Sequence, residues 1–92
     1  MADDLQKQVD DAKAALDLMN NPAFVSAISE VKNRVVNKWV SGEFKTVEDR
    51  EEAFRTVRAV ELLQEKLRVL VDRGSMASAQ IERSKRAPAQ KN

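Results

Sequence analysis

Apolar residues recur at steps of three or four along most of the chain, and no stretch alternates apolar and polar residues as a strand would. The first such stretch covers roughly residues 3–19. Its apolar positions form a narrow stripe of Leu5, Val9, Ala12, Leu16 and Met19. A stripe this narrow is typical of a coiled-coil seam, so the pattern predicts a helix that packs against one neighbour.

The second stretch is bounded by residues that suit the two ends of a helix. Asn21 is a good N-cap and Pro22 fits the first helical position, while Gly42 suits a left-handed C-terminal cap. The apolar positions between them are Phe24, Ile28, Val31, Val35 and Trp39. We therefore expect a helix from Pro22 to just before Gly42 at the centre of the core.

The third stretch is the longest and runs from about Val47 to Arg73. Thr46 and Asp49 resemble a capping box at its start. Its main apolar stripe consists of Ala53, Val57, Val60, Leu63, Leu67, Leu70 and Val71. A second stripe consists of Val47, Phe54, Leu62 and Val69. Two stripes on one helix predict two sets of neighbours, one within the chain and one from another chain.

Gly74 predicts the end of this helix, and Ser75 could cap a short fourth helix from Met76 to about Ser84. Residues 83–92 carry no acid and are predicted to be disordered unless bound. The fold class expected is all-α with three main helices: the second and third form an antiparallel hairpin, and the first packs on it. Residues 1–82 would form a single helical domain and residues 83–92 a basic tail.

The predicted core draws on all three helices. It consists of Leu16, Phe24, Ile28, Val31, Val35, Trp39, Val57, Val60, Leu63, Leu67 and Leu70. Trp39 could instead be an exposed anchor for a partner, but its register with the stripe favours the core. Phe44 would close the end of the hairpin. Phe54 lies off the main stripe and is the better candidate for an interface.

The composition of the 92 residues excludes most catalytic chemistry. There is no Cys and no His, and the two Gly residues lie far apart, so disulfides, thiol nucleophiles, imidazole bases and Gly-rich phosphate loops are absent. The carboxylates of Glu48, Asp49, Glu51 and Glu52 fit the positive end of a helix dipole better than a cation site. We expect a non-enzymatic protein with no catalytic, cofactor or metal site. No stretch matches a membrane span or a signal peptide, which predicts an intracellular protein.

The charges balance overall but not locally. The chain has 16 basic and 15 acidic residues, with −3 over residues 1–20, 0 over residues 21–82 and +4 over residues 83–92. The basic tail is therefore a candidate contact for DNA phosphates, although it could equally be a solubilising end. Its basic residues are Arg83, Lys85, Arg86 and Lys91. Because the turn at Ser41-Gly42 is followed by a long helix rather than a short recognition helix, the chain does not fit a helix-turn-helix.

The order of these features resembles a known group of proteins. The chain resembles small helical proteins of tailed-bacteriophage and prophage late gene clusters. The features that carry the resemblance are, in order, the run Asn20-Asn21-Pro22-Ala23-Phe24, an aliphatic helix reaching Trp39, the run Glu48-Asp49-Arg50-Glu51 at the start of a long helix, and a Leu-rich stretch that ends at Gly74. The resemblance covers roughly residues 16–77. It implies a role in virion assembly or DNA packaging, in the cytoplasm of an infected bacterium or associated with the virion. One candidate within this group is the oligomerisation core of a small terminase subunit. Such subunits commonly carry an N-terminal helix-turn-helix, and this sequence does not show one.

These observations lead to one main hypothesis and two alternatives. The main hypothesis is a non-enzymatic interaction protein that assists phage head assembly or DNA packaging by homo- or hetero-oligomerisation. Its expected contacts are Leu5, Val9, Phe54, Leu62 and Val69, where apolar surface would otherwise be left exposed. One alternative is a small terminase-like subunit that contacts DNA through the tail. The other is a phage-encoded inhibitor that binds a host protein. None of these involves a membrane or a small-molecule substrate.

Overall fold

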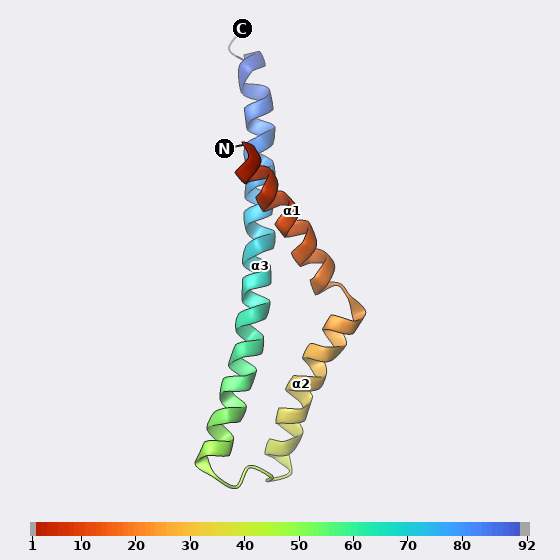
Figure 1. The fold of residues 1–92 in the computed structure, drawn as a ribbon, viewed down its shortest axis with the longest axis vertical. Coiled ribbons are helices and arrows are strands. Elements are labelled where there is room, and N and C mark those ends of the chain that lie inside the picture. The colour runs from red at the N-terminus through yellow and green to blue at the C-terminus, as the bar shows by residue number, and fades with distance from the viewer. Residues whose placement is uncertain (1, 91–92) are drawn as a thin grey trace. The chain divides into compact units, whose positions relative to one another are not determined.

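The computed structural model describes residues 2–90 and contains three helices within that range (Figure 1). They are α1 (Ala2–Met19), α2 (Pro22–Val40) and α3 (Val47–Gln90). No strand occurs among the described residues, so the predicted all-α class is confirmed. Contacts divide the chain into two compact units: one holds α1 up to Leu18 together with α3 from Lys66, and the other runs from Met19 to Glu65.

Both ends of α2 form as the sequence predicts. The side-chain oxygen of Asn21 accepts hydrogen bonds from the backbone N–H groups of Ala23 at 2.9 Å and Phe24 at 3.2 Å. At the other end Gly42 has a φ of 74°, and its N–H donates to the carbonyl of Trp39 at 3.2 Å. The N–H of Glu43 donates to the carbonyl of Lys38 at 2.9 Å, which completes a Schellman cap. These caps fix where α2 begins and where the connector to α3 leaves it.

The start of α3 also agrees with the sequence, but its end does not. The hydroxyl oxygen of Thr46 accepts a hydrogen bond from the backbone N–H of Asp49 at 3.1 Å, as expected of an N-cap. The helix then continues through Gly74 to Gln90. The predicted helix end at Gly74 and the separate fourth helix are therefore wrong. The helix also includes residues 83–90 of the predicted disordered tail, and Lys91 and Asn92 lie outside the described residues.

Within the first unit, Gly74 lies where α3 meets α1. A methyl group built on Gly74 would overlap the Cβ of Ala12 and lie 3.0 Å from the carbonyl oxygen of Gln8. Ala15 and Ala77 are buried in the same unit. Small residues on both helices thus allow the two backbones to approach closely. This explains why a glycine stands inside a helix, where it would otherwise cost about 1 kcal/mol relative to alanine.

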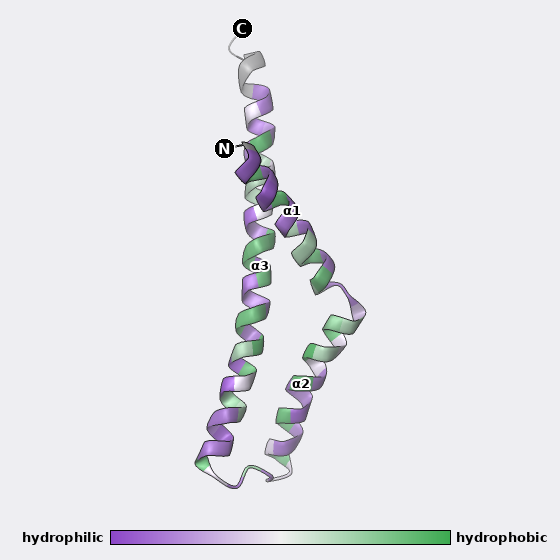
Figure 2. Ribbon diagram, viewed as in Figure 1, coloured by the Kyte–Doolittle hydropathy of each residue, from purple (hydrophilic) through white to green (hydrophobic). Residues whose placement is uncertain are grey.

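Within the second unit, α2 and the first part of α3 run antiparallel on either side of the connector (Figure 1). Ala53 is buried between them, and Phe24, Ile28, Val35, Val57 and Val60 are half-buried. The ammonium group of Lys32 donates a hydrogen bond to the side-chain oxygen of Gln64 at 3.0 Å and ties the two helices together. Figure 2 shows the apolar and polar residues alternating around both helices, as expected of elements with one covered and one exposed side.

The buried set is smaller than the sequence predicts. Among the described residues the buried apolar side chains are Ala15, Ala53, Leu67 and Ala77. Leu67 was a predicted core residue, but four others are exposed: Leu16, Val31, Trp39 and Leu63. On α1 the residues that contact α3 are Ala12 and Ala15 rather than Leu16. The two helices lie so close at Gly74 that only small side chains fit between them, and Leu16 stays exposed. On α2 and α3 a two-helix contact covers only a narrow strip, so stripe residues at its edges remain in solvent.

Candidate interaction surface

A shallow apolar hollow lies where α2 ends and α3 begins. Trp39, Val47 and Phe54 form its apolar part, and the charged side chains around them are Arg50, Glu51 and Arg55. The exposed fractions are 56% for Trp39, 55% for Val47 and 66% for Phe54. Large apolar side chains gathered at one place and framed by charges are typical of a site that contacts another macromolecule.

The connector holds Trp39 in this position. The rings of Trp39 and Phe44 pack edge to face, with centroids 5.7 Å apart and an interplanar angle of 70°. The guanidinium of Arg50 donates to the carbonyl oxygen of Phe44 at 3.5 Å. Phe44 is half-buried, in keeping with its predicted place at the end of the hairpin. One side of Trp39 is therefore packed within the unit while most of the rest is open to solvent.

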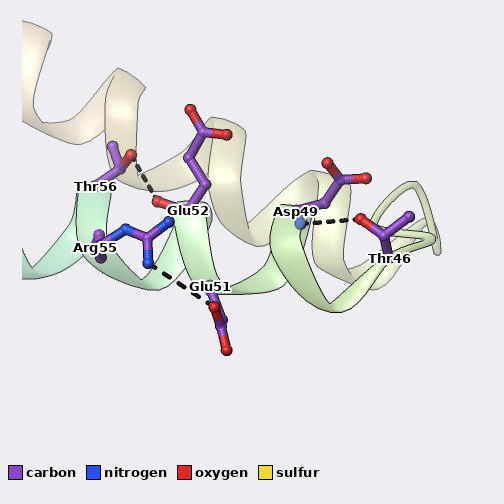
Figure 3. Close-up of polar contacts among 6 residues, drawn as sticks. All are labelled: Thr46, Asp49, Glu51, Glu52, Arg55 and Thr56. Carbon is purple, nitrogen blue, oxygen red and sulfur yellow. Dashed lines mark hydrogen bonds and ion pairs between the residues drawn. The ribbon is translucent and has the colours of Figure 1, made fainter.

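The acidic residues at the start of α3 point in different directions. In Figure 3 the carboxylate of Glu51 lies on the opposite side of the helix from those of Asp49 and Glu52. Glu51 is 3.9 Å from the guanidinium of Arg55, and the hydroxyl of Thr56 donates to the backbone carbonyl of Glu52 at 2.9 Å (Figure 3). Over the described part of the chain, no group of three or more Asp or Glu side chains is placed to hold a metal ion.

A second hollow of about 770 Å³ lies between α2 and the start of α3. Its apolar part includes Val31, Val35 and Phe44. Its charged residues are Glu30, Arg34, Lys38, Glu43, Asp49 and Glu52. Charges of both signs and an open mouth suit a polar contact.

The residues predicted to form intermolecular contacts lie in different surroundings. Phe54 and Leu62 are exposed, with 46% of Leu62 open to solvent. Leu5, Val9 and Val69 are half-buried. Leu5 and Val9 share the stripe of Ala12, which meets Gly74, so this side of α1 faces a contact within the first unit. The structure therefore brings Phe54 together with Trp39 and Val47 within the second unit, whereas the side of α1 that carries Leu5 and Val9 is used within the first.

The sequence could have indicated the exposure of Trp39. The residue stands two positions before the C-cap Ser41, so no further turn of α2 follows to cover it. Val47 belongs to the second stripe of α3 and stands at the first position of that helix. The positions of Trp39 and Val47 at helix ends therefore indicate that they are exposed, whereas the spacing of the apolar stripe predicts a buried Trp39.

The basic residues near the C-terminus lie on α3. Arg83, Lys85 and Arg86 are exposed, and Lys91 lies outside the described residues. Arg83 and Arg86 are three residues apart and share one side of the helix, whereas Lys85 projects elsewhere. As a helix, this segment therefore presents a pair of guanidinium groups rather than a continuous basic strip.

Two acidic residues of α1, Asp10 and Asp11, are paired locally. The amide nitrogen of Gln6 donates to Asp10 at 3.1 Å, and the ammonium group of Lys7 donates to Asp11 at 2.9 Å. This hydrogen bond from Lys7 and the charge of Asp11 raise the pKa of Lys7 above its usual value. Residues four apart on a solvated helix commonly pair in this way, with a small effect on stability.

Comparison with known proteins returns no family model, no curated protein and no solved structure that matches this chain. The resemblance to phage late-gene proteins therefore stays a prediction. None of the helices within residues 2–90 is both long and apolar enough to cross a membrane.

Proposed function

We propose that this chain is a non-enzymatic helical assembly protein that associates with other copies of itself. The contact surface is the outer face of α3, which we define as Val47, Glu51, Phe54, Arg55, Arg58 and Leu62, with Trp39 at its edge. The observation that carries the proposal is the 66% exposure of Phe54 in a hollow shared with the half-exposed Trp39 and Val47.

Burial of this surface would be favourable. Removing a side chain as large as Phe54 from water contributes roughly 1.5–3 kcal/mol. Trp and Arg are the residues most often found to dominate binding energy, and Trp39, Arg50 and Arg55 all line the hollow. An apolar centre surrounded by charged groups is also the usual composition of an interface.

The small buried set gives a second reason for association. Of the four buried apolar side chains among the described residues, three are alanines, which contribute little apolar area. Short chains commonly compensate for a small core with disulfides, metals or oligomerisation. With no Cys and no His in the sequence, a second chain is the simplest source of further buried surface.

The biological setting in this proposal is phage head assembly or DNA packaging, which rests on the resemblance of residues 16–77. A ring-forming role like that of the small terminase oligomerisation core would need a second contact surface besides this one, because a ring is closed by head-to-tail contacts. The DNA-contacting alternative depends on Arg83, Lys85, Arg86 and Lys91, and the inhibitor alternative would use the outer face of α3 on a host protein. We favour self-association because three large apolar side chains gather in one hollow, whereas the described basic residues near the C-terminus place a single pair on one side of α3.

Replacing Phe54 with Ser tests the proposal. We expect Phe54→Ser to weaken self-association by about tenfold or more, since loss of an anchor at an interface commonly costs about 2 kcal/mol or more. Sedimentation velocity over a range of concentrations measures this. Val25→Ser is the matched control, because Val25 is also exposed but lies at the other end of α2. Equal association of the wild type and Phe54→Ser would contradict the proposal.

A further inference from the structure

The order of charged and apolar residues along the outer face of α3 is complementary to the same order read in the opposite direction. From its N-terminal to its C-terminal end it reads Val47, Glu51, Phe54, Arg55, Arg58 and Leu62. Spacings of three, four and seven residues place these positions on one side of a helix. Reversing the order sets the acid at one end against the base at the other, and one aliphatic residue against another. An antiparallel copy of the same helix would therefore meet complementary groups on both sides of the centre, which Phe54 and Arg55 occupy.

We infer that two copies of this chain associate through an antiparallel contact of their outer faces, with the twofold axis passing between residues 54 and 55. This inference rests on the proposed function and names the partner as a second, identical chain. Glu51 of one copy then lies opposite Arg58 of the partner subunit. Val47 shares a layer with the partner subunit's Leu62. The two Phe54 rings meet beside the axis.

Symmetry makes every favourable contact occur twice. In a twofold contact the same patch is used on both chains, so the Glu51–Arg58 pair forms once on each side of the axis. The two Arg55 side chains flank the axis, each beside the Glu51 of its own chain at 3.9 Å. Aromatic rings that meet across an interface contribute beyond the area that they bury. The charges thus fix the register while the apolar residues supply the driving force.

The ion pairs within one chain leave these side chains available. Arg55 lies 3.9 Å from Glu51, and Arg58 lies 3.7 Å from Glu61. Both pairs are long and at least half of each side chain is exposed, apart from Glu61 at 48%. Exposed pairs of this kind hold their partners weakly. Arg58 can therefore leave Glu61 for the Glu51 of a second chain at little cost, while that Glu51 stays beside its own Arg55.

Charge reversal tests this register directly. In Glu51→Arg the facing pairs become Arg against Arg, and in Arg58→Glu they become Glu against Glu. We expect each variant alone to self-associate roughly tenfold or more weakly than the wild type, because facing like charges repel. When the two variants are mixed, the introduced arginine of one chain would meet the introduced glutamate of the other, so mixed dimers should form. Native mass spectrometry separates them from the homodimers, since the two variants differ in mass.

The double variant and a control pair complete the test. Glu51→Arg combined with Arg58→Glu in one chain restores both pairs and should recover association. Asp17→Arg and Lys13→Glu make the matching charge reversals at exposed positions of α1 that line neither hollow, and they should leave association unchanged. Absence of mixed dimers and of recovery in the double variant, with the wild type still associating, would overturn this inference alone. A wild type that stays monomeric would overturn the self-association in the proposed function as well.

Discussion

Two glycines in this chain serve different physical purposes. Gly42 has a φ of 74°, a left-handed backbone conformation that disfavours other residues, and nothing lies within 4 Å of where its Cβ would be. Gly74 is inside a helix, and the space for its Cβ is already taken by Ala12. Gly42 is therefore needed for the shape of the backbone and Gly74 for the distance between two helices.

The same substitution at both positions separates these purposes. We expect Gly74→Ala to lower the free energy of unfolding by about 1–3 kcal/mol, the usual cost of forcing extra atoms into a packed contact. Alanine would be favourable at an uncrowded helix position, so a gain in stability would contradict the close approach of α1 and α3. Urea denaturation followed by circular dichroism measures the change.

A compensating change provides the control. Removing the methyl group of the facing residue by Ala12→Gly should recover part of the stability that Gly74→Ala loses, because it empties the contested space. Ala12→Gly should not rescue Gly42→Ala, which we expect to cost about 1–2 kcal/mol through backbone strain. Equal effects of Ala12→Gly on the two variants would show that Gly74 does not lie against Ala12.

At the scale of helices, the three starts and the ends of α1 and α2 could be predicted, and the end of α3 could not. Asn21, Gly42 and Thr46 act as caps as expected, because a cap depends on residues close together in the sequence. Gly74 has the same local signature as Gly42, yet α3 continues past it. What distinguishes them is the contact of Gly74 with Ala12, a residue far away in the sequence, and no local pattern contains that information.

A proline at position 75 tests whether α3 is continuous. Ser75 is exposed, so Ser75→Ala should be tolerated, and it serves as the control. Ser75→Pro removes a backbone N–H and places its ring against the carbonyl of Val71. We expect it to lower the free energy of unfolding by about 3 kcal/mol and to reduce the helical signal in circular dichroism. If Ser75→Pro folds as stably as Ser75→Ala, a helix boundary at Gly74 would be the better description.

For the molecule as a whole, the sequence predicted the fold class and most of the apolar stripes, but not how much of each stripe is covered. Trp39 lies in register with Ile28 and Val35 and is nevertheless 56% exposed. Leu16 and Leu63 are also exposed, whereas the smaller Ala15 and Ala53 are buried. Periodicity identifies the side of a helix that is apolar, but burial depends on how closely the neighbouring helix approaches and where it ends.

Periodicity indicated some residues of the candidate surface but not how neighbouring elements bring them together. Phe54 and Leu62 stood out because they lie off the main stripe of α3, and both are exposed. Trp39 and Val47 joined them only through the geometry of the connector, which brings two helix ends together. Leu5 and Val9 also belong to an apolar stripe for which the sequence shows no neighbour. Both are half-buried, and the helix that meets this side of α1 is α3 of the same chain.

The central claim is that the outer face of α3 joins identical chains, and the mass of the native protein tests it most directly. The unmodified 10.4 kDa chain should be measured from low to high micromolar concentration by native mass spectrometry or sedimentation equilibrium, since association depends on concentration. The account predicts that species of at least twice the chain mass become dominant as concentration rises. A single species at the mass of one chain across the whole range would contradict it.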